Sequence, residues 1–581
     1  MINTDRPIRR CPRTAIVPAL VAVATLGVSA PAAAQPYTSL NNFYTGIRQS
    51  AAQAGYTLPL VTSTTYREVV CSYFWGFPLE EMYRAQYANF AKYGFSVNEL
   101  WAPGSLNTGT TVVAPNLNVL NSTAFLNLSG STAFVITVPA TTTYNVMQIL
   151  DAYTDVTRSV GTRNWFTSAS STAGGDYLLV GPGFDLGTLP SGLNLSGTIQ
   201  NPTNQAWLIG RVAVDPYATG DIVTGAATPY SLVAGGAANA LSLPASKTVV
   251  QSFGLTPLAT FQSGTITGPV TTTTTGTSIY SSIPTGTTFY QWLGDNVALN
   301  GVPGTTGTAG TGQMAMFQNF SAIGLGTNGF TMPDATTVNT MTTASQQALN
   351  ALNAIGKNLT AVNPSAATST NWTVSTNLGE YQPSYNGWIT AATTAYVGLG
   401  ANVAADGVYP QATLSSGSTV LNGDTAYTIS FPANGTGVGV PPAQGFWSIT
   451  VYGTNGLIVP NTGNTYYGDN VYSISSMQLS NVMGSGYGQQ AFSILLSSTA
   501  PSDPNLMPYW LPTPAGKDFE VIMRIYYPAG ASAESSILVS STAANYYLVP
   551  AITPVPEPGT IGLVFVAVVS TAGWSMRRRR G

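Results

Sequence analysis

Residues 132–153 read TAFVITVPATTTYNVMQILDAY and hold two strand-like runs, 132–138 and 144–153, on either side of a turn-forming Pro-Ala-Thr-Thr segment. Both runs are short and rich in β-branched and aromatic side chains, which is typical of strands. Two similar runs follow at 177–180 and 206–214, bounded by clusters of glycine, proline and asparagine. Short strands separated by such turns predict a β-sandwich.

Helical patterns flank this β-rich block. Before it we expect helices at 37–55 and 66–93, and Pro78 is expected to kink or split the second. After it, residues 218–284 are rich in glycine, serine and threonine and are expected to form a loop or strand-rich excursions. Further helices are expected at 289–297, 313–322, 335–359 and 385–396. A second β-rich block spans 409–550, with alternating strands at 427–431, 447–452 and 519–527. The predicted fold class is mainly β with helical segments, as two β-sandwich domains around a helical insertion.

The composition limits the chemistry of the chain. Of 581 residues, 7% are charged and none is histidine, which excludes a Ser-His-Asp triad and makes a zinc site unexpected. Many of the basic residues are arginines at the two ends (Arg6, Arg9, Arg10, Arg13 and residues 577–580), so the body between them is acidic. It has no basic stripe, and we expect no nucleic-acid partner. Of the two cysteines, Cys11 lies in the N-terminal segment that we expect to be removed with the signal peptide. The body then keeps one cysteine, Cys71, and cannot form an internal disulfide.

Residues 1–34 have the layout of a secretory signal peptide. Arginines come first, an apolar stretch follows at 15–28, and three alanines stand at 32–34. The alternative is an uncleaved membrane anchor, but the apolar stretch is shorter than the roughly 20 residues that span a bilayer. We expect signal peptidase to cut between Ala34 and Gln35, so the chain is predicted to be exported.

The other end carries Val555-Pro-Glu-Pro-Gly-Thr560, then an apolar run at 561–576 and four arginines. This order resembles the PEP-CTERM sorting signal. The resemblance implies that an exosortase, a membrane transpeptidase, recognises Pro556, Glu557 and Pro558 and that the tail is removed during delivery to the surface of a Gram-negative bacterium. The apolar run would hold the chain in the inner membrane transiently, with its arginines in the cytoplasm. A plain C-terminal anchor is the alternative, and it would not need the Pro-Glu-Pro triplet.

Ordered motifs in the body resemble two paired families. Motifs at 73–84, 147–154, 161–163, 175–183 and 207–211 are similar to the domain of unknown function numbered 1254. Motifs at 445–452, 510–514 and 523–528 are similar to its usual companion, numbered 1214. The resemblance implies an immunoglobulin-like sandwich, a helical insertion and a jelly-roll-like sandwich, and it implies no established reaction.

The expected organisation has six segments. They are a signal peptide (1–34), an N-terminal helical segment (35–110), the 1254-like sandwich (111–284), a helical segment (285–403), the 1214-like domain (404–550) and a sorting tail (551–581).

The chain departs from the first family at positions that bear on chemistry. That family usually has an asparagine-rich turn with an acidic residue, a tyrosine and a second acidic residue. Asn118, Asn121 and Asn127 stand at those places here, and Ser430 stands where the second family often has histidine. An amide neither takes up nor releases a proton near neutral pH, so this predicted turn lacks a general acid and base.

Three aspartates are the candidate polar cluster. Asp151 and Asp155 are four residues apart and share one face of a strand or a helix, and Asp176 could join them across a hairpin. Together with Arg211 they form the candidate ligand or calcium site, because calcium prefers carboxylate and carbonyl oxygens. The aspartates could also act as an acid pair. They could instead form structural ion pairs with Arg158, Arg163 or Arg211. No other cofactor is expected.

The sequence also contains two weaker patterns. Gly324, Gly326 and Gly329 match Gly-x-Gly-x-x-Gly, but a helical segment precedes them and no acidic residue follows at the expected distance, which argues against dinucleotide binding. Aromatic residues of the second block could stack on sugar rings, although aromatics in sandwiches usually form core. They are Trp447, Tyr452, Tyr466, Tyr467, Trp510, Tyr526 and Tyr527.

These features predict an exported, exosortase-sorted protein of the cell surface or exopolysaccharide matrix, with a structural or ligand-binding role. Its expected partners are signal peptidase, exosortase and exopolysaccharide. The alternative is an extracellular hydrolase that acts on a polymer through a carboxylate pair, because glycoside hydrolysis needs only an acid pair. The absence of histidine and of a Gly-x-Ser-x-Gly elbow favours the first, and whether the chain is an enzyme stays open.

Replacing Pro556, Glu557 and Pro558 with alanine should leave an unprocessed form in the membrane, because the sorting enzyme would lose its recognition motif. Cell fractionation with an antibody to the body measures this, and Pro554→Ala is the control. Normal surface release of the triple variant would contradict the sorting assignment.

Overall fold

The structure is a computed structural model that describes residues 39–555 with internal gaps. The gaps are 104–105, 107–114, 167–168, 216–241, 272–275, 277–279, 281, 304–307, 358–369, 376–377, 382, 434–438, 455, 460–472 and 529–546. The predicted cleavage site at Ala34 and Gln35, the Pro556–Pro558 triplet and the apolar run 561–576 lie outside the described residues. Within the described part, no helix is long and apolar enough to cross a membrane.

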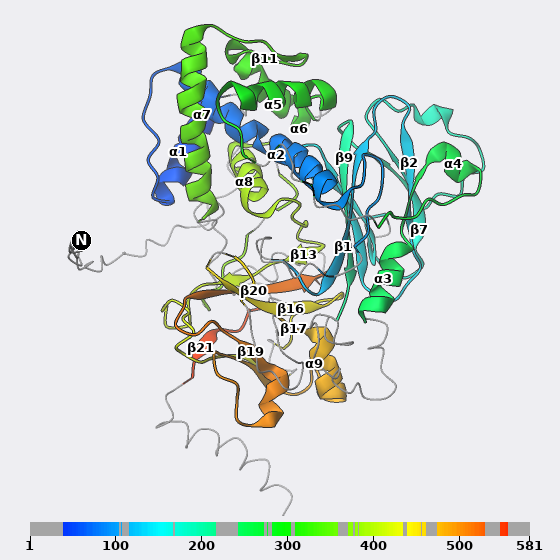
Figure 1. Cartoon of the computed structure of the whole chain (residues 1–581), viewed down its shortest axis with the longest axis vertical. Coiled ribbons are helices and arrows are strands. Elements are labelled where there is room, and N and C mark those ends of the chain that lie inside the picture. The colour runs from blue at the N-terminus through cyan, green and yellow to red at the C-terminus, as the bar shows by residue number, and fades with distance from the viewer. Residues whose placement is uncertain are drawn as a thin grey trace, which may run out of the picture.

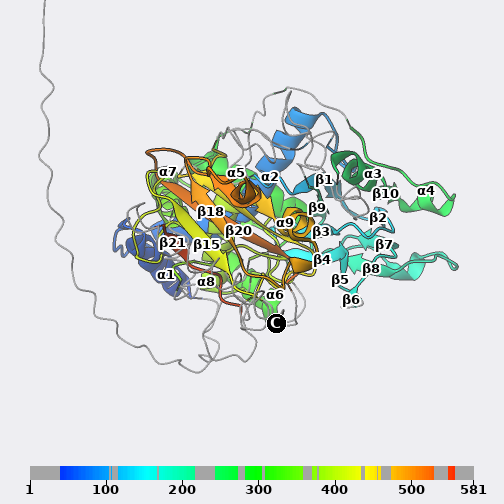
Figure 2. The same cartoon turned by 90° about the horizontal axis from the view of Figure 1, so that it is seen from below.

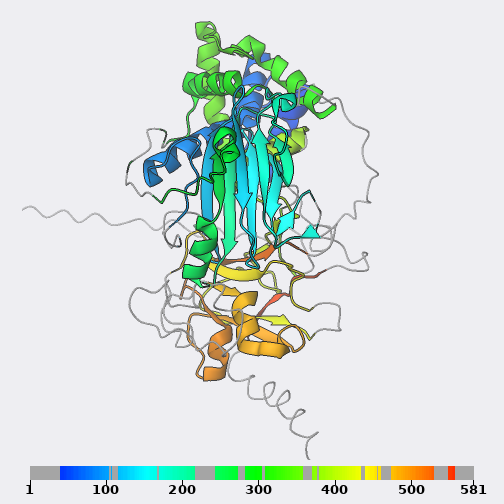
Figure 3. The same ribbon diagram turned by 90° about the vertical axis from the view of Figure 1, so that its right-hand side faces the viewer.

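The first β-sandwich consists of two four-stranded sheets (Figures 1 and 3). One sheet has the order β1 (Val119–Asn127), β9 (Gln205–Ala213), β3 (Asn145–Asp151) and β4 (Val156–Gly161), all antiparallel. The other has the order β10 (Gly254–Pro257), β2 (Ala133–Val138), β7 (Gly175–Val180) and β8 (Gly197–Gln200), and its last pair is parallel. A short hairpin of β5 (Arg163–Asn164) and β6 (Ala169–Ser170) extends β4. The sandwich core forms between the sheets, with Leu126, Ile136, Ile149, Leu179 and Leu208 among its members.

The structure corrects two expectations in this block. The asparagine-rich segment expected as a turn is strand β1, because Leu120, Ala124 and Leu126 on one side of the segment enter the sandwich core while the strand pairs fully with β9. Part of the segment expected as loop or excursion forms helix α3 (Leu243–Gln251), strand β10 and helix α4 (Leu258–Gln262). The hydroxyl of Ser242 caps α3, and Leu243 and Val250 fill one end of the core.

Two distant sequence segments build a single helical unit. The N-terminal segment gives α1 (Leu40–Gln53) and α2 (Thr64–Tyr93). The later segment gives α5 (Gly286–Asn300), α6 (Thr308–Phe317), the 3-10 helix Gln318–Ile323, α7 (Ala335–Gly356) and α8 (Tyr385–Gly398). All the expected helices are thus confirmed, and their buried side chains share one core. The sequence pattern could not indicate that the two segments pack together.

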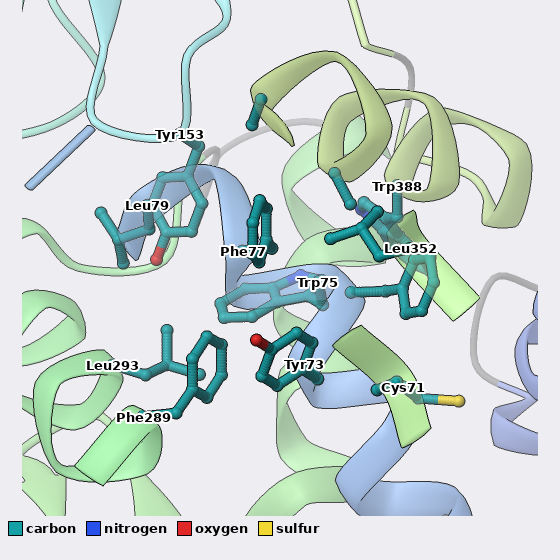
Figure 4. Packing of buried hydrophobic residues seen from close by; sticks show 14 of the residues in the cluster. Cys71, Tyr73, Trp75, Phe77, Leu79, Tyr153, Phe289, Leu293, Leu352 and Trp388 are labelled. Atoms are coloured by element: carbon teal, nitrogen blue, oxygen red, sulfur yellow. The ribbon is translucent and has the colours of Figure 1, made fainter. Parts of the chain in front are cut away.

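Helix α2 is the centre of this unit. Every residue from Glu68 to Glu80 is buried, so the helix packs against neighbours on all sides. Figure 4 shows Tyr73, Trp75 and Phe77 reaching in different directions toward the other helices. The helix also continues through Pro78, so of the kink or split expected there, the split does not occur. The indole N–H groups of Trp75 and of Trp388 in α8 both donate to Oε1 of Gln313, at 2.8 and 2.9 Å, which ties α2, α6 and α8 together.

The second sandwich also has two sheets. One is built on β20 (Phe519–Tyr526), with β16 (Trp447–Gly453), β17 (Ser473–Ser475), β13 (Gly407–Val408) and β14 (Gln411–Ala412). The other has the order β19 (Trp510–Pro512), β18 (Phe492–Ser497), β15 (Tyr427–Phe431) and β21 (Ile552–Pro554). Figure 2 looks onto these strands from below. The three strands expected here are confirmed, but helix α9 (Ser476–Met483), which begins with a Ser475–Gln478 capping box, was not expected.

The outer face of the β1–β9–β3–β4 sheet is buried where the three parts meet. Phe125, Leu150 and Trp207 on this face belong to the helical core. Further along the same strands, Val119 and Val146 pack with Phe446 and Tyr526 of the second sandwich. The sheet therefore carries the helical unit and the second sandwich side by side on one surface.

We expect Gly294→Ala to destabilise the protein by about 1–3 kcal/mol, since a Cβ on this α5 residue would lie 2.5 Å from the backbone nitrogen of Phe330 and 2.9 Å from the backbone of Gly329. Gly398→Ala, at the end of α8, is the control, because its Cβ would meet no atom within 4 Å. Chemical denaturation measures both variants. Equal stability of the two would contradict the packing of the Gly329–Phe330 strand against α5.

Candidate functional site

The structure brings Asp151 and Asp155 together in the turn between β3 and β4. Oδ1 of Asp151 accepts the backbone N–H groups of Tyr153 and Asp155 at 2.9 and 3.0 Å. Oδ1 of Asp155 accepts the N–H of Tyr381 at 2.7 Å, and the Val156 N–H donates to the Gly379 carbonyl at 2.7 Å. The turn thereby anchors the chain segment that leads into α8.

Asp176 does not join this pair. It lies at the start of β7 in the other sheet, where its Oδ1 accepts the hydroxyl of Thr137 at 2.6 Å. The Asp151 turn lies near the opposite end of β7, because Thr203 accepts the Ala152 N–H there and the neighbouring Asn201 binds the Val180 carbonyl. The three aspartates therefore form no common site.

The expected ion pairs between these aspartates and nearby arginines are not formed. Arg158 stacks on Trp165 at 5.2 Å, Arg163 pairs with Asp406, and Arg211 binds Gln148 and Gly400. Ion pairs in the described ranges include Arg163–Asp406 and Arg84–Glu81. The aspartates support the fold through backbone N–H groups instead.

Burial controls the charge of the Asp151 turn. Desolvation raises the pKa of Asp151 to about 7, although two backbone N–H groups oppose the shift. Burial, and then the nearby Asp151, raise the pKa of Asp155 well above its usual value. Calcium takes six to eight oxygen ligands, and the described residues contain no group of three or more acidic, cysteine or histidine side chains placed to hold a metal. The turn is built to accept N–H groups.

The other sequence candidates serve the architecture. The glycine motif is a hairpin of β11 (Leu325–Gly326) and β12 (Gly329–Phe330) with no strand before it, which does not suit a dinucleotide. Among the aromatics, Trp447, Tyr452 and Trp510 are at most 1% exposed and form core. Ser430 lies within hydrogen-bond distance, 2.9 Å, of Ser493 on the exposed side of β15. Tyr466 and Tyr467 lie outside the described residues.

The three asparagines at 118, 121 and 127 do not form a common site, but one of them lines a cavity. Asn118 is fully buried before the strand and Asn127 is at its far end, so the three are spread along β1 rather than gathered in a turn. Asn121 is exposed on the wall of a cavity. This cavity is therefore the candidate functional site.

The cavity has a volume of about 420 Å³ and lies where both sandwiches meet α8. Its walls come from β1 and β9 of the first sandwich, from α8 and the residues after it, and from β14 and β20 of the second. The lining residues are Pro115, Asn116, Val119, Asn121, Trp207, Ile209, Arg211, Ser375, Leu378, Thr394, Val397, Gly398, Leu399, Gly400, Ala401, Tyr409, Gln411, Ile522, Arg524 and Tyr526. Ligand sites are commonly found in such clefts between domains.

Arg211 enters the cavity from the first sandwich. It stands directly opposite Asn121 in the β1–β9 register, and both lie on the outer face of the sheet. Its guanidinium donates to Oε1 of Gln148 at 2.5 Å and to the Gly400 carbonyl at 2.9 Å. Both acceptors are neutral, and they hold the head group at the cavity wall.

Arg524 enters from the second sandwich. It lies on β20, is 5% exposed, donates to the Thr450 hydroxyl at 3.4 Å and sits over the ring of Tyr452 at 5.4 Å. The hydroxyl of Tyr526 accepts a hydrogen bond from Asn116, and that of Tyr409 accepts one from Asn402. The described lining thus combines two arginines with amides and aromatic rings, and it contains no acidic side chain.

Sequence reasoning identified Arg211, Asn121 and Tyr526 but did not place them in one site. It missed Arg524 and Tyr409. Arg524 lies, with Glu520, among apolar and aromatic residues in the strand Phe519–Tyr526, and this was an available signal, since a buried arginine needs a specific environment.

Two family models and one solved structure agree with this architecture. Residues 97–231 match the family described as protein of unknown function (DUF1254), and residues 406–530 match protein of unknown function (DUF1214). The crystal structure of the VPA0106 protein from Vibrio parahaemolyticus covers 85% of this chain and 100% of its own, with 17% identity and a TM-score of 0.54. The match to the crystal structure of a putative uncharacterized protein from Burkholderia cenocepacia covers 84% of this chain and 93% of that protein, with 11% identity and a TM-score of 0.31. No curated protein matches the chain. The paired families are those that the motifs resemble, and the Vibrio structure supports the fold alone.

We expect Asp151→Asn to reduce the loss of stability that accompanies a rise in pH. The pKa of Asp151 is about 7 in the folded protein, whereas an unfolded aspartate titrates at about 4. The folded state therefore holds more protons between these values, and stability falls as pH rises through this window. Asparagine keeps the acceptor oxygen and has no charge to bury.

Thermal unfolding midpoints at pH 5 and pH 7.5 measure this effect. The difference between the unfolding midpoints of Asp151→Asn and the unmodified protein should be a few degrees more favourable to the variant at pH 7.5 than at pH 5. Asp176→Asn should show no such change. Parallel pH profiles for the unmodified protein and Asp151→Asn would contradict the buried-carboxyl assignment.

Proposed function

We propose that this is an exported surface protein that binds a ligand in the cavity between its two sandwiches and does not turn it over. The observation that carries the proposal is the cavity itself, whose described lining joins Arg211 and Arg524 with amides and aromatic rings and has no acidic side chain. The signal-peptide layout and the tail that resembles a sorting signal support export and surface delivery.

The lining favours binding over hydrolysis. A glycosidase needs two carboxyl groups on either side of the bond that it cleaves. Asp151 and Asp155 do not line the cavity, and each accepts backbone N–H groups within a buried turn. Asn121 has an amide, which neither takes up nor releases a proton near neutral pH. The hydrolase alternative therefore has no support from the described lining.

The chemistry of the walls suits a polar, ring-containing ligand. Trp207, Tyr409 and Tyr526 offer aromatic surface, while Asn116, Asn121 and Gln411 offer amide groups. Aromatic surface with a few polar groups is the usual composition of a carbohydrate or small-molecule site. Fragments of the exopolysaccharide matrix are the ligands that we propose.

The test is isothermal titration of the purified mature protein with oligosaccharides released from the exopolysaccharide of the producing cell. Ala401→Trp should abolish binding because the indole would fill the cavity, while Ala52→Trp, on an exposed position of α1, should not. Mass spectrometry of the sugars should find them unchanged after prolonged incubation. Shortened sugars, or binding that survives Ala401→Trp, would contradict the proposal.

A further inference from the structure

We infer that the cavity selects a sugar that carries a carboxylate. Arg211 is the residue that binds this carboxylate. Asn121 is its neutral neighbour and leaves the positive charge of Arg211 available to the ligand. The inference rests on the proposed function, because it names the class of ligand that the same cavity takes.

The charge of the cavity is the first argument. Arg211 and Arg524 reach it from different sandwiches, and none of the described lining residues is acidic. Burial raises the pKa of Tyr409 and of Tyr526 above that of a free tyrosine, so the phenols stay neutral and do not balance the arginines. A cavity lined by two cations and, among the described residues, by no anion favours an anionic occupant.

The environment of Arg211 is the second argument. A guanidinium has five N–H donors, and the bonds of this one go to the amide oxygen of Gln148 and the carbonyl of Gly400. These acceptors fix its position without cancelling its charge. Asn121 is the direct cross-strand neighbour, at a distance where an aspartate could pair with Arg211. The amide leaves the charge in place and adds an N–H donor for the same carboxylate.

The size of the cavity is the third argument. A volume of about 420 Å³ exceeds what an inorganic anion needs and falls in the range of small-molecule sites. Trp207 from the first sandwich and Tyr409 from the second provide aromatic surface beside the arginines. A pyranose ring with a carboxylate would satisfy both the cationic and the aromatic parts of the wall.

The experiment compares digalacturonate with galactobiose, which has the same rings without carboxylates. Binding to the purified mature protein is measured by titration calorimetry at low and high salt. We expect digalacturonate to bind at least tenfold more tightly at low salt, and this preference should shrink at high salt. Sodium phosphate should compete only weakly.

Three variants test the anchor. Asn121→Asp should reduce digalacturonate affinity at least tenfold and galactobiose affinity much less, because the new carboxylate would pair with Arg211 and repel only the acidic sugar. Arg211→Gln should have the same effect on digalacturonate. Arg158→Gln, which removes an exposed arginine stacked on Trp165, should have none. Circular dichroism checks that each variant is folded. Asn121→Asp does not change Gln148 or Gly400, so the hydrogen-bond acceptors of Arg211 stay in place.

The outcomes separate the two proposals. If both sugars bind equally and Ala401→Trp abolishes both, the cavity is a binding site but the carboxylate assignment is overturned. Phosphate that binds as tightly as digalacturonate would overturn the sugar part of the inference. The proposed function fails together with the inference if the unmodified protein binds none of the sugars, that is, digalacturonate, galactobiose or the matrix oligosaccharides.

Discussion

Burial of both faces of the β1–β9–β3–β4 sheet is the constraint on which the rest of the structure depends. The inner face closes the first sandwich, through residues such as Met147 and Leu208. The outer face meets the helical core at Trp207 and the second sandwich at Val146. Loss of this sheet would therefore expose three apolar surfaces at once, and the free energy of apolar burial scales with the area removed from water.

The few charged residues of the body serve as connections between these parts. Asp406, fully buried in the segment that starts the second sandwich, pairs with Arg163 and accepts the hydroxyl of Ser159 from β4. Asp155 ties the first sandwich to the segment before α8, and Arg211 ties it to the segment after α8 through Gly400. Because α8 is held at both ends, the wall that it contributes to the cavity is fixed relative to the first sandwich.

Much of the fold could be predicted from local patterns. Helical spacing located α1, α2, α5, α7 and α8, and alternation located β2, β3, β9, β15, β16 and β20. Local patterns failed where a long-range contact decided the outcome. Strand β1 contains several asparagines that favour turns, yet complete pairing with β9 and burial of Leu120 and Leu126 outweigh that preference. Helix α3 is short and covers one end of the first sandwich, a position that only the tertiary structure defines.

The candidate site was harder to predict than the fold because its members are distant in sequence. Local spacing indicates Asp151 and Asp155 as the candidate pair, but their carboxylates hold backbone N–H groups in the structure. Asn121, Arg211, Tyr409 and Arg524 come together only when the two sandwiches and α8 assemble. Correct pairing of β1 with β9 would have predicted the first contact, since the antiparallel register sets Asn121 opposite Arg211. The meeting with Arg524 depends on how the second sandwich docks, and no periodicity within a strand contains that information. An interdomain cavity of this kind ties its chemistry to assembly, so its two arginines can act on one ligand only in the fully folded chain.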